Sequence, residues 1–200
     1  MKRSQPQRSS ITLLGLIGLG LALLFSRSSA AEDPPREAKF EDLVLKVPAS
    51  WKQQPPANNL RLGQFEIPPV EGDKEPAELT VFNFGFGGGI KANVDRWTEQ
   101  FEEQNRKIKT TSAKCPQGEY VFVDVTGTYK KPIGPPVMRK TQPAPGFRML
   151  GLILAVEKKG NYFLKLTGPE KTVTAAAAAF RASIGGNEKE EKPLDSEKAE

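Results

Sequence analysis

The spacing of apolar residues in this 200-residue chain switches between period two and period 3.6, and that switching limits the folds open to it. Period two is typical of β-strands, whose side chains point alternately to the two faces of a sheet. Seven segments are predicted as strands on this basis: 40–47, 60–67, 77–86, 107–114, 120–129, 147–157 and 161–167. Lys158-Lys159-Gly160-Asn161, between the last two, predicts a hairpin turn.

Two other segments, 90–103 and 172–184, have the helical period. A helix with one apolar stripe needs another layer to cover it, so an α+β fold is predicted, with two helices packed on an antiparallel sheet of six to seven strands. Thr172 or Thr174 is expected to cap the start of the second helix, and Gly185-Gly186 its end. The stripes are Ile90, Val94, Trp97 and Phe101 in the first helix, and Val173, Ala177, Phe180 and Ile184 in the second.

The N-terminal residues 1–31 are predicted to be a signal peptide. Three cations in the first eight residues precede an apolar run, 11–25, whose 15 residues suit a signal and are short for a membrane span. Small residues then allow cleavage after Ala30 or Ala31. We therefore expect a periplasmic or secreted protein. The alternative is a membrane-tethered protein with an uncleaved signal-anchor, because Arg27 closes the apolar run with a charge.

Cleavage of this signal changes the charge balance of the chain. The full sequence has a net charge of +5, whereas the mature chain holds 25 Lys and Arg against 24 Asp and Glu. A chain that is nearly neutral after cleavage gives no general argument for nucleic-acid binding. We expect a short linker at 32–37, one α+β domain at 38–186 and a disordered acidic tail at 187–200, which carries six acids and three lysines.

The chain contains no histidine, and this limits its chemistry. Mechanisms that use imidazole as a base or as a metal ligand are excluded, which leaves carboxylate pairs, Lys, Tyr or Ser-Lys chemistry. The single Cys115 cannot form an internal disulfide, and we interpret it as a sheltered thiol, with pairing between chains as the alternative. Trp51, Trp97 and Phe101 are interpreted as core anchors.

Two further patterns do not amount to a catalytic or cofactor site. The turn Gly85-Phe86-Gly87-Gly88-Gly89 lacks the last glycine of a phosphate-binding motif, because residue 90 is Ile, and it is interpreted as a strand-to-helix turn or a flap. Four carboxylates are candidates for acid–base work: Glu66, Glu78, Glu119 and Asp124. Nothing in the sequence pairs them, and Asp124 alternates with Val123 and Val125, which predicts a solvated or cross-strand position on the outer face of the sheet. We expect no enzyme activity, cofactor or metal.

The stretch 130–148 is the best candidate for an interaction surface. It contains five prolines and no acid, and it is predicted to be a long, extended loop, with a solvated long hairpin connection that has no binding role as the alternative. Its cations suit an anionic macromolecule or an envelope protein. The candidate partner-binding residues are Lys130, Lys131, Arg139, Lys140 and Arg148.

A resemblance adds to this interpretation. The segment 40–51, Phe-Glu-Asp-Leu-Val-Leu-Lys-Val-Pro-Ala-Ser-Trp, is similar to the opening strand and Pro-x-x-Trp turn of the PsbP-like fold, and Phe180–Ile184 resembles its closing helix. The stretches 147–150 and 166–173 resemble those of uncharacterised exported bacterial proteins. The resemblance implies a PsbP-like sandwich that acts by docking to other proteins and not by catalysis.

The sequence thus leads to an exported, non-catalytic accessory or binding module as the expected function. Two alternatives stay open at this point. One is a hydrolase or lyase that uses carboxylates or Lys, and the other is a small-ligand carrier.

The predicted signal peptide can be tested on the exported protein. Intact mass spectrometry is expected to give a chain that begins at Ala31 or Glu32, since small residues precede both bonds. A cell-associated chain that retains residues 1–31 would contradict cleavage and support the signal-anchor.

Overall fold

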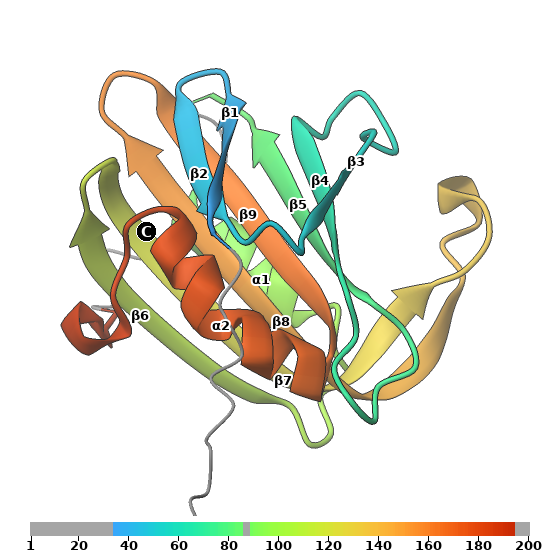
Figure 1. Cartoon of the computed structure of the whole chain (residues 1–200). Helices are drawn as coiled ribbons and strands as arrows, with labels where there is room; N and C mark the ends of the chain where they lie inside the picture. The colour runs from blue at the N-terminus through green and yellow to red at the C-terminus, as the bar shows by residue number, and fades with distance from the viewer. Residues whose placement is uncertain (1–33, 86–88, 195–200) are drawn as a thin grey trace, which may run out of the picture. The chain divides into compact units, whose positions relative to one another are not determined.

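The computed structural model describes residues 34–85 and 89–194, all within one compact unit, Glu32–Glu200. Its main element is an eight-stranded antiparallel sheet in the order β10-β6-β7-β8-β9-β5-β4-β3, and a separate hairpin pairs β1 with β2 (Figure 1). The strands are β1 Arg36–Phe40, β2 Leu43–Val47, β3 Lys52–Gln54, β4 Gly63–Ile67, β5 Ala77–Asn83, β6 Lys107–Cys115, β7 Gly118–Pro132, β8 Thr141–Val156, β9 Gly160–Pro169 and β10 Lys192–Pro193. The helices are α1 Ile90–Thr98 and α2 Glu170–Ser183, with short 3-10 turns η1 Pro136–Met138 and η2 Glu188–Glu190.

The sheet is covered on both faces. One face packs against α2 and the β1–β2 hairpin, whereas α1 lies on the other face (Figure 1). Along β7, Tyr120 and Phe122 enter the α2-side core, and the alternating residues Val121, Val123 and Val125 enter the α1-side core. The predicted α+β class, with two helices on an antiparallel sheet, is confirmed, but the main sheet has eight strands where six to seven were predicted, because the short edge strands β3 and β10 were not expected.

Three of the differences from the predicted element boundaries change where apolar side chains lie. The segment expected to be one strand over 40–47 is a hairpin that turns at Glu41, whose φ is +53°. Because β4 begins only at Gly63, Leu60 remains 67% exposed. Helix α1 ends at Thr98, and Phe101 instead enters the core through an isolated bridge to Tyr129.

Helix α2 is capped by a residue distant in sequence. Its N-cap is Pro169, which offers no side-chain hydrogen bond, so neither Thr172 nor Thr174 caps the helix as expected. Instead the Thr172 N–H and hydroxyl donate to Asp73 Oδ2 at 2.8 and 2.6 Å. This carboxylate accepts a hydrogen bond from a free N–H group at the helix N-terminus and interacts favourably with the partial positive charge there. At the other end Gly185, with φ +79°, terminates the helix as predicted.

The acidic stretch expected to be a disordered tail is ordered as far as Leu194, which corrects the prediction. Residues 187–194, here called the C-terminal strap, form η2 and then pair with β6 through β10. Glu191 accepts a hydrogen bond from Arg181 Nε at 2.8 Å, and the side chains of Glu191 and Arg181 are only 2% and 6% exposed. Arg181 also lies 3.9 Å from the Phe122 ring centroid, and the Thr111 hydroxyl donates to Glu191 at 2.8 Å. A buried ion pair between distant residues therefore fixes a segment that composition alone marks as disordered.

The N-terminal predictions fall largely outside the described residues. The predicted signal at 1–31 is not described, and β1 begins at Arg36, so the last two residues of the expected linker belong to a strand. Across residues 34–85 and 89–194, neither helix has the length and apolar content to cross a bilayer.

The Arg181–Glu191 pair predicts a large effect on stability. The substitution Glu191→Ala leaves Arg181 buried without its closest carboxylate, which typically costs about 3–5 kcal/mol. Urea unfolding is expected to show this loss. Glu190→Ala is the matched control, because the neighbouring Glu190 is exposed. Equal stability of the two variants would contradict the structural role of the pair.

Candidate functional site

The stretch predicted to be a long loop is mainly a β ribbon. Pairing of β7 with β8 shifts register between Gly127 and Tyr129 and then continues to Pro132 opposite Thr141. Residues 128–146, here called the β7–β8 arm, extend away from the other strands (Figure 1). Only 133–140 form a connecting tip, so the prediction of an extended loop is wrong for the rest of the stretch.

Contacts at its base hold the arm to the body of the domain. The Tyr129 ring stacks on Phe147 with 5.7 Å between centroids, and it lies 5.2 Å from the Phe101 ring. The Lys130 backbone N–H donates to the Gln100 carbonyl oxygen at 2.8 Å. The arm therefore leaves the sheet from a packed aromatic base.

The five candidate cations have different surroundings. Arg148 forms a bidentate pair with Asp124, at 2.9 and 2.6 Å, and donates to the Thr174 hydroxyl at 2.8 Å. Hydrogen bonding to Asp124 is the main cause of the raised pKa of Arg148. Lys131 is paired with Glu75 and lies 5.7 Å from the Phe147 ring centroid. These two cations are engaged in internal contacts.

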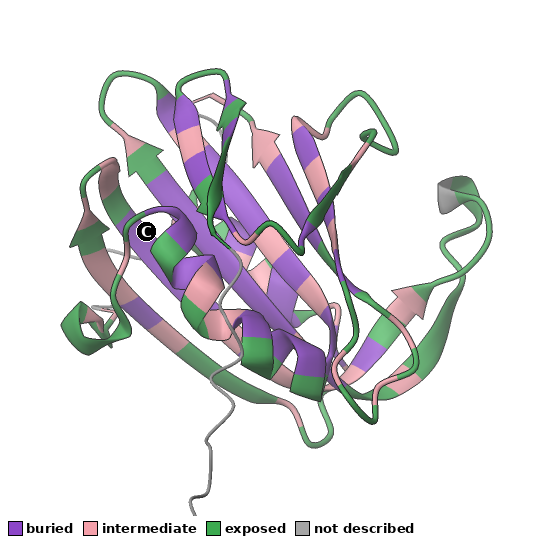
Figure 2. Ribbon diagram, viewed as in Figure 1, coloured by how far each residue is buried: buried purple, intermediate pink, exposed green. Residues whose placement is uncertain are grey.

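The other three candidate cations are exposed. Lys130 Nζ donates to the Glu99 carbonyl oxygen at 3.1 Å, whereas Arg139 and Lys140 at the tip have no carboxylate within ion-pair distance among the described residues. The described residues include six large apolar side chains that are exposed, and three of them lie at the tip: Ile133, Val137 and Met138. Val137 is 88% exposed, and the ribbon of the arm is coloured largely as exposed in Figure 2. The tip thus combines apolar and cationic groups.

The candidate carboxylates are paired with cations or amides where the structure shows their contacts. Glu78 accepts from Arg61 at 3.1 Å and from the Gln64 amide at 2.8 Å, and Glu66 lies opposite it on β4. Lys114 lies 2.8 Å from Glu119. Asp124 has the predicted cross-strand role through Arg148, but it shares a face with Tyr120 and Phe122 on the α2 side. Among the described residues, no three acids or cysteines gather as a metal site.

Lys165 is a functional candidate that the sequence analysis did not single out. Its ammonium donates to the Gln100 amide oxygen and lies 3.5 Å from the Tyr129 hydroxyl. Desolvation by burial lowers the pKa of Lys165 to about 8, although Glu78 acts in the opposite direction. Because Glu78 is engaged by Arg61 and Gln64, it is not placed as a proton acceptor for Lys165. The contact with Gln100 ties β9 to the segment after α1.

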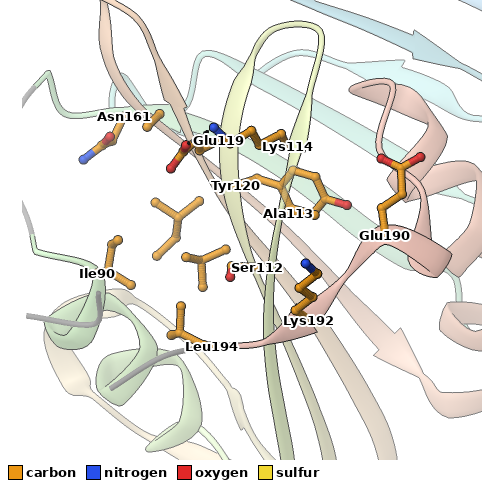
Figure 3. A pocket seen from close by; sticks show the side chains of 13 residues that line it. Ile90, Ser112, Ala113, Lys114, Glu119, Tyr120, Asn161, Glu190, Lys192 and Leu194 are labelled. Atoms are coloured by element: carbon orange, nitrogen blue, oxygen red, sulfur yellow. Dashed lines mark ion pairs between the residues drawn. The ribbon is translucent and has the colours of Figure 1, made fainter. Parts of the chain in front are cut away.

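A cavity of about 820 Å³ lies on the sheet near the start of α1 and the C-terminal strap (Figure 3). Its lining combines apolar side chains of β7 and β8 with polar groups of β6, β9 and the strap. Residues 86–88 of the glycine-rich turn are outside the described residues, so its prediction as a turn or flap concerns residues with no described geometry. The predicted shelter of Cys115 is confirmed, since it is partly buried against the α2-side core.

Comparison with known proteins identifies a similar solved structure. The chain is similar to the cyanobacterial PsbP (CyanoP) of Synechocystis sp. PCC 6803, with 11% identity and a TM-score of 0.45, over 86% of this chain and 99% of that one. That protein belongs to the group named by the sequence resemblance. No protein-family model matches the chain, and no curated protein matches it.

The lowered pKa of Lys165 predicts how stability varies with pH. Between pH 8 and the ordinary value of 10.5, the unfolded chain binds a proton that the folded chain has released, so stability rises with pH. We expect a gain of about 1–2 kcal/mol in unfolding free energy between pH 8 and 10, measured with urea. Lys165→Met should flatten this rise, whereas the control Lys158→Met, at an exposed turn, should keep it. If the unfolding free energies of the two variants changed with pH in the same way, the rise could not be assigned to Lys165.

Proposed function

We propose that this chain is an exported, non-catalytic accessory module that docks onto an acidic partner protein through the tip of its β7–β8 arm. The observation that carries the proposal is the composition of the tip. Arg139 and Lys140 stand beside Val137 and Met138, and the stretch 130–148 contains no acid. Exposed apolar groups next to cations are typical of surfaces that bury an apolar centre and complement a negative rim.

The arm is preorganised for binding. Its two strands hydrogen-bond to each other up to Pro132 and Thr141, and the Ile133 N–H donates to the Lys140 carbonyl oxygen at 3.0 Å to close the tip. The Lys131–Glu75 pair holds one strand of the arm to the loop before β5. Binding therefore requires less ordering than a free loop of the same length.

The environment of the ionisable groups supports a non-catalytic role. A hydrolase that uses paired carboxylates needs two acids facing one substrate, typically about 5–10 Å apart. In the described part of the chain, Glu78, Glu119 and Asp124 each lie in contact with a cation, and Glu66 has as its cross-strand neighbour Glu78, whose carboxylate is already engaged by Arg61 and Gln64. Lys165 is surrounded by Gln100 and Tyr129, with Glu78 already engaged. Export is proposed from the N-terminal pattern of residues 1–31.

Photo-crosslinking at the tip tests the proposal. A benzophenone amino acid at Val137 is expected to give a discrete adduct with one partner in intact cells, because this side chain is 88% exposed. The same amino acid at Leu60, which is 67% exposed and lies off the arm, is the matched control. The partner identified by mass spectrometry is then purified for direct binding measurements.

Charge reversal tests the cationic contribution with the purified partner. Arg139→Glu with Lys140→Glu is expected to weaken binding at least about tenfold, with a larger effect at low salt. The control reverses another adjacent exposed pair, Lys158 and Lys159 in the β8–β9 turn. Equal binding by both double variants, or equal adducts from positions 137 and 60, would refute docking through the tip.

A further inference from the structure

The 820 Å³ cavity is lined by both apolar and polar side chains, and the proposed docking function uses none of them. On the α1 side of the sheet, Val121 and Ile153 are cross-strand partners on β7 and β8 and form an apolar floor. Ile90, from the first turn of α1, and Leu194, from the strap, add apolar walls (Figure 3). The volume falls within the range of pockets that hold small ligands, about 300–1,000 Å³.

Polar side chains stand at the border of this floor. Lys114 is paired with Glu119 at 2.8 Å. Glu119 lies opposite Ala155, and Ala155 lies opposite Asn161, so Asn161 is on the same face of the sheet. Glu190 accepts from the Asn187 amide at 3.3 Å. Lys192 is the remaining charged residue of the lining, and within the described residues no carboxylate lies within 4.0 Å of its ammonium. Apart from the Lys114–Glu119 pair, the lining thus holds one cation, Lys192, and one carboxylate, Glu190, that are in no ion pair among the described residues.

The wall that carries this cation is held in a defined position. Lys192 lies opposite Ser112 in the β10–β6 pairing, and the Leu194 N–H donates to the Thr110 carbonyl oxygen at 3.1 Å. One residue before Lys192, Glu191 forms the buried pair with Arg181. A cation on a fixed strand next to an apolar floor suits a ligand with an anionic head and an apolar body, because each part meets its complement.

We propose that this cavity binds a small monoanionic ligand with an apolar body, such as an aromatic or medium-chain carboxylate, with its head at Lys192 and its body on Val121 and Ile153. The site shares no residue with the β7–β8 arm. Failure of either proposal therefore leaves the other standing.

Two fluorescent dyes with nearly the same rings test the head and the body separately. Anilinonaphthalene sulfonate carries one negative charge, and phenylnaphthylamine is its neutral counterpart. Both are expected to bind the folded protein with saturable one-to-one stoichiometry, and decanoate should displace them. Lys192→Gln should weaken binding of the sulfonate about tenfold and leave the neutral dye within about twofold. Lys189→Gln, an exposed strap residue outside the lining, is the matched control.

A second variant tests the location of the apolar body. Ala155 lines the cavity and is exposed on β8, so Ala155→Phe should fill the space without disturbing the core and should abolish binding of both dyes. Amide chemical shifts provide an independent measurement, and Asn161 and Lys192 are expected to move on titration with the sulfonate dye. No saturable binding to the wild type, equal loss of both dyes in Lys192→Gln, or shifts confined to other strands would overturn the proposal.

Discussion

Burial of both faces of the β7–β8 pair is the constraint on which the rest of this structure depends. In each strand, neighbouring residues enter opposite cores: Leu150 and Leu152 face α2, whereas Met149 and Ile153 face the α1 side. A shift of one residue in the pairing would exchange these two sets and place each against the wrong layer. The register is therefore fixed along the pair. The arm is the continuation of the same two strands beyond the covering layers, so its pairing starts from this fixed register.

The same constraint explains which parts of the fold were predictable. Period-two and period-3.6 spacing is a local signal of burial on one side, and it located both helices and most strands. The hairpin at Glu41 was missed because both of its strands bury their apolar residues in the same core, and period two is broken by only one extra residue, between Phe40 and Leu43. The arm was missed because its strands are exposed and rich in proline, and they carry no such signal.

Long-range pairing accounts for the errors at the candidate site. The sequence grouped five cations by proximity along the chain, but Asp124 and Glu75, which bind two of them, come from distant positions. Of the five candidates, Lys130, Arg139 and Lys140 are exposed, and Arg139 and Lys140 lie at the tip. Lys165 has a weak sequence signal, a lysine amid the apolar residues of β9, and its functional interest depends on Gln100 and Tyr129, which no local pattern brings there.

The C-terminal strap links stability to the cavity. The composition of 187–200 predicts disorder, since six acids in 14 residues repel one another, yet the Arg181–Glu191 pair and the β10–β6 contact hold the strap, 187–194, on the domain. Because Lys192 and Leu194 form one wall of the cavity, the proposed ligand would bind the chain with the strap in place more tightly than a chain without it. Linkage then requires that the ligand stabilise the docked strap by the same free energy by which docking improves ligand affinity.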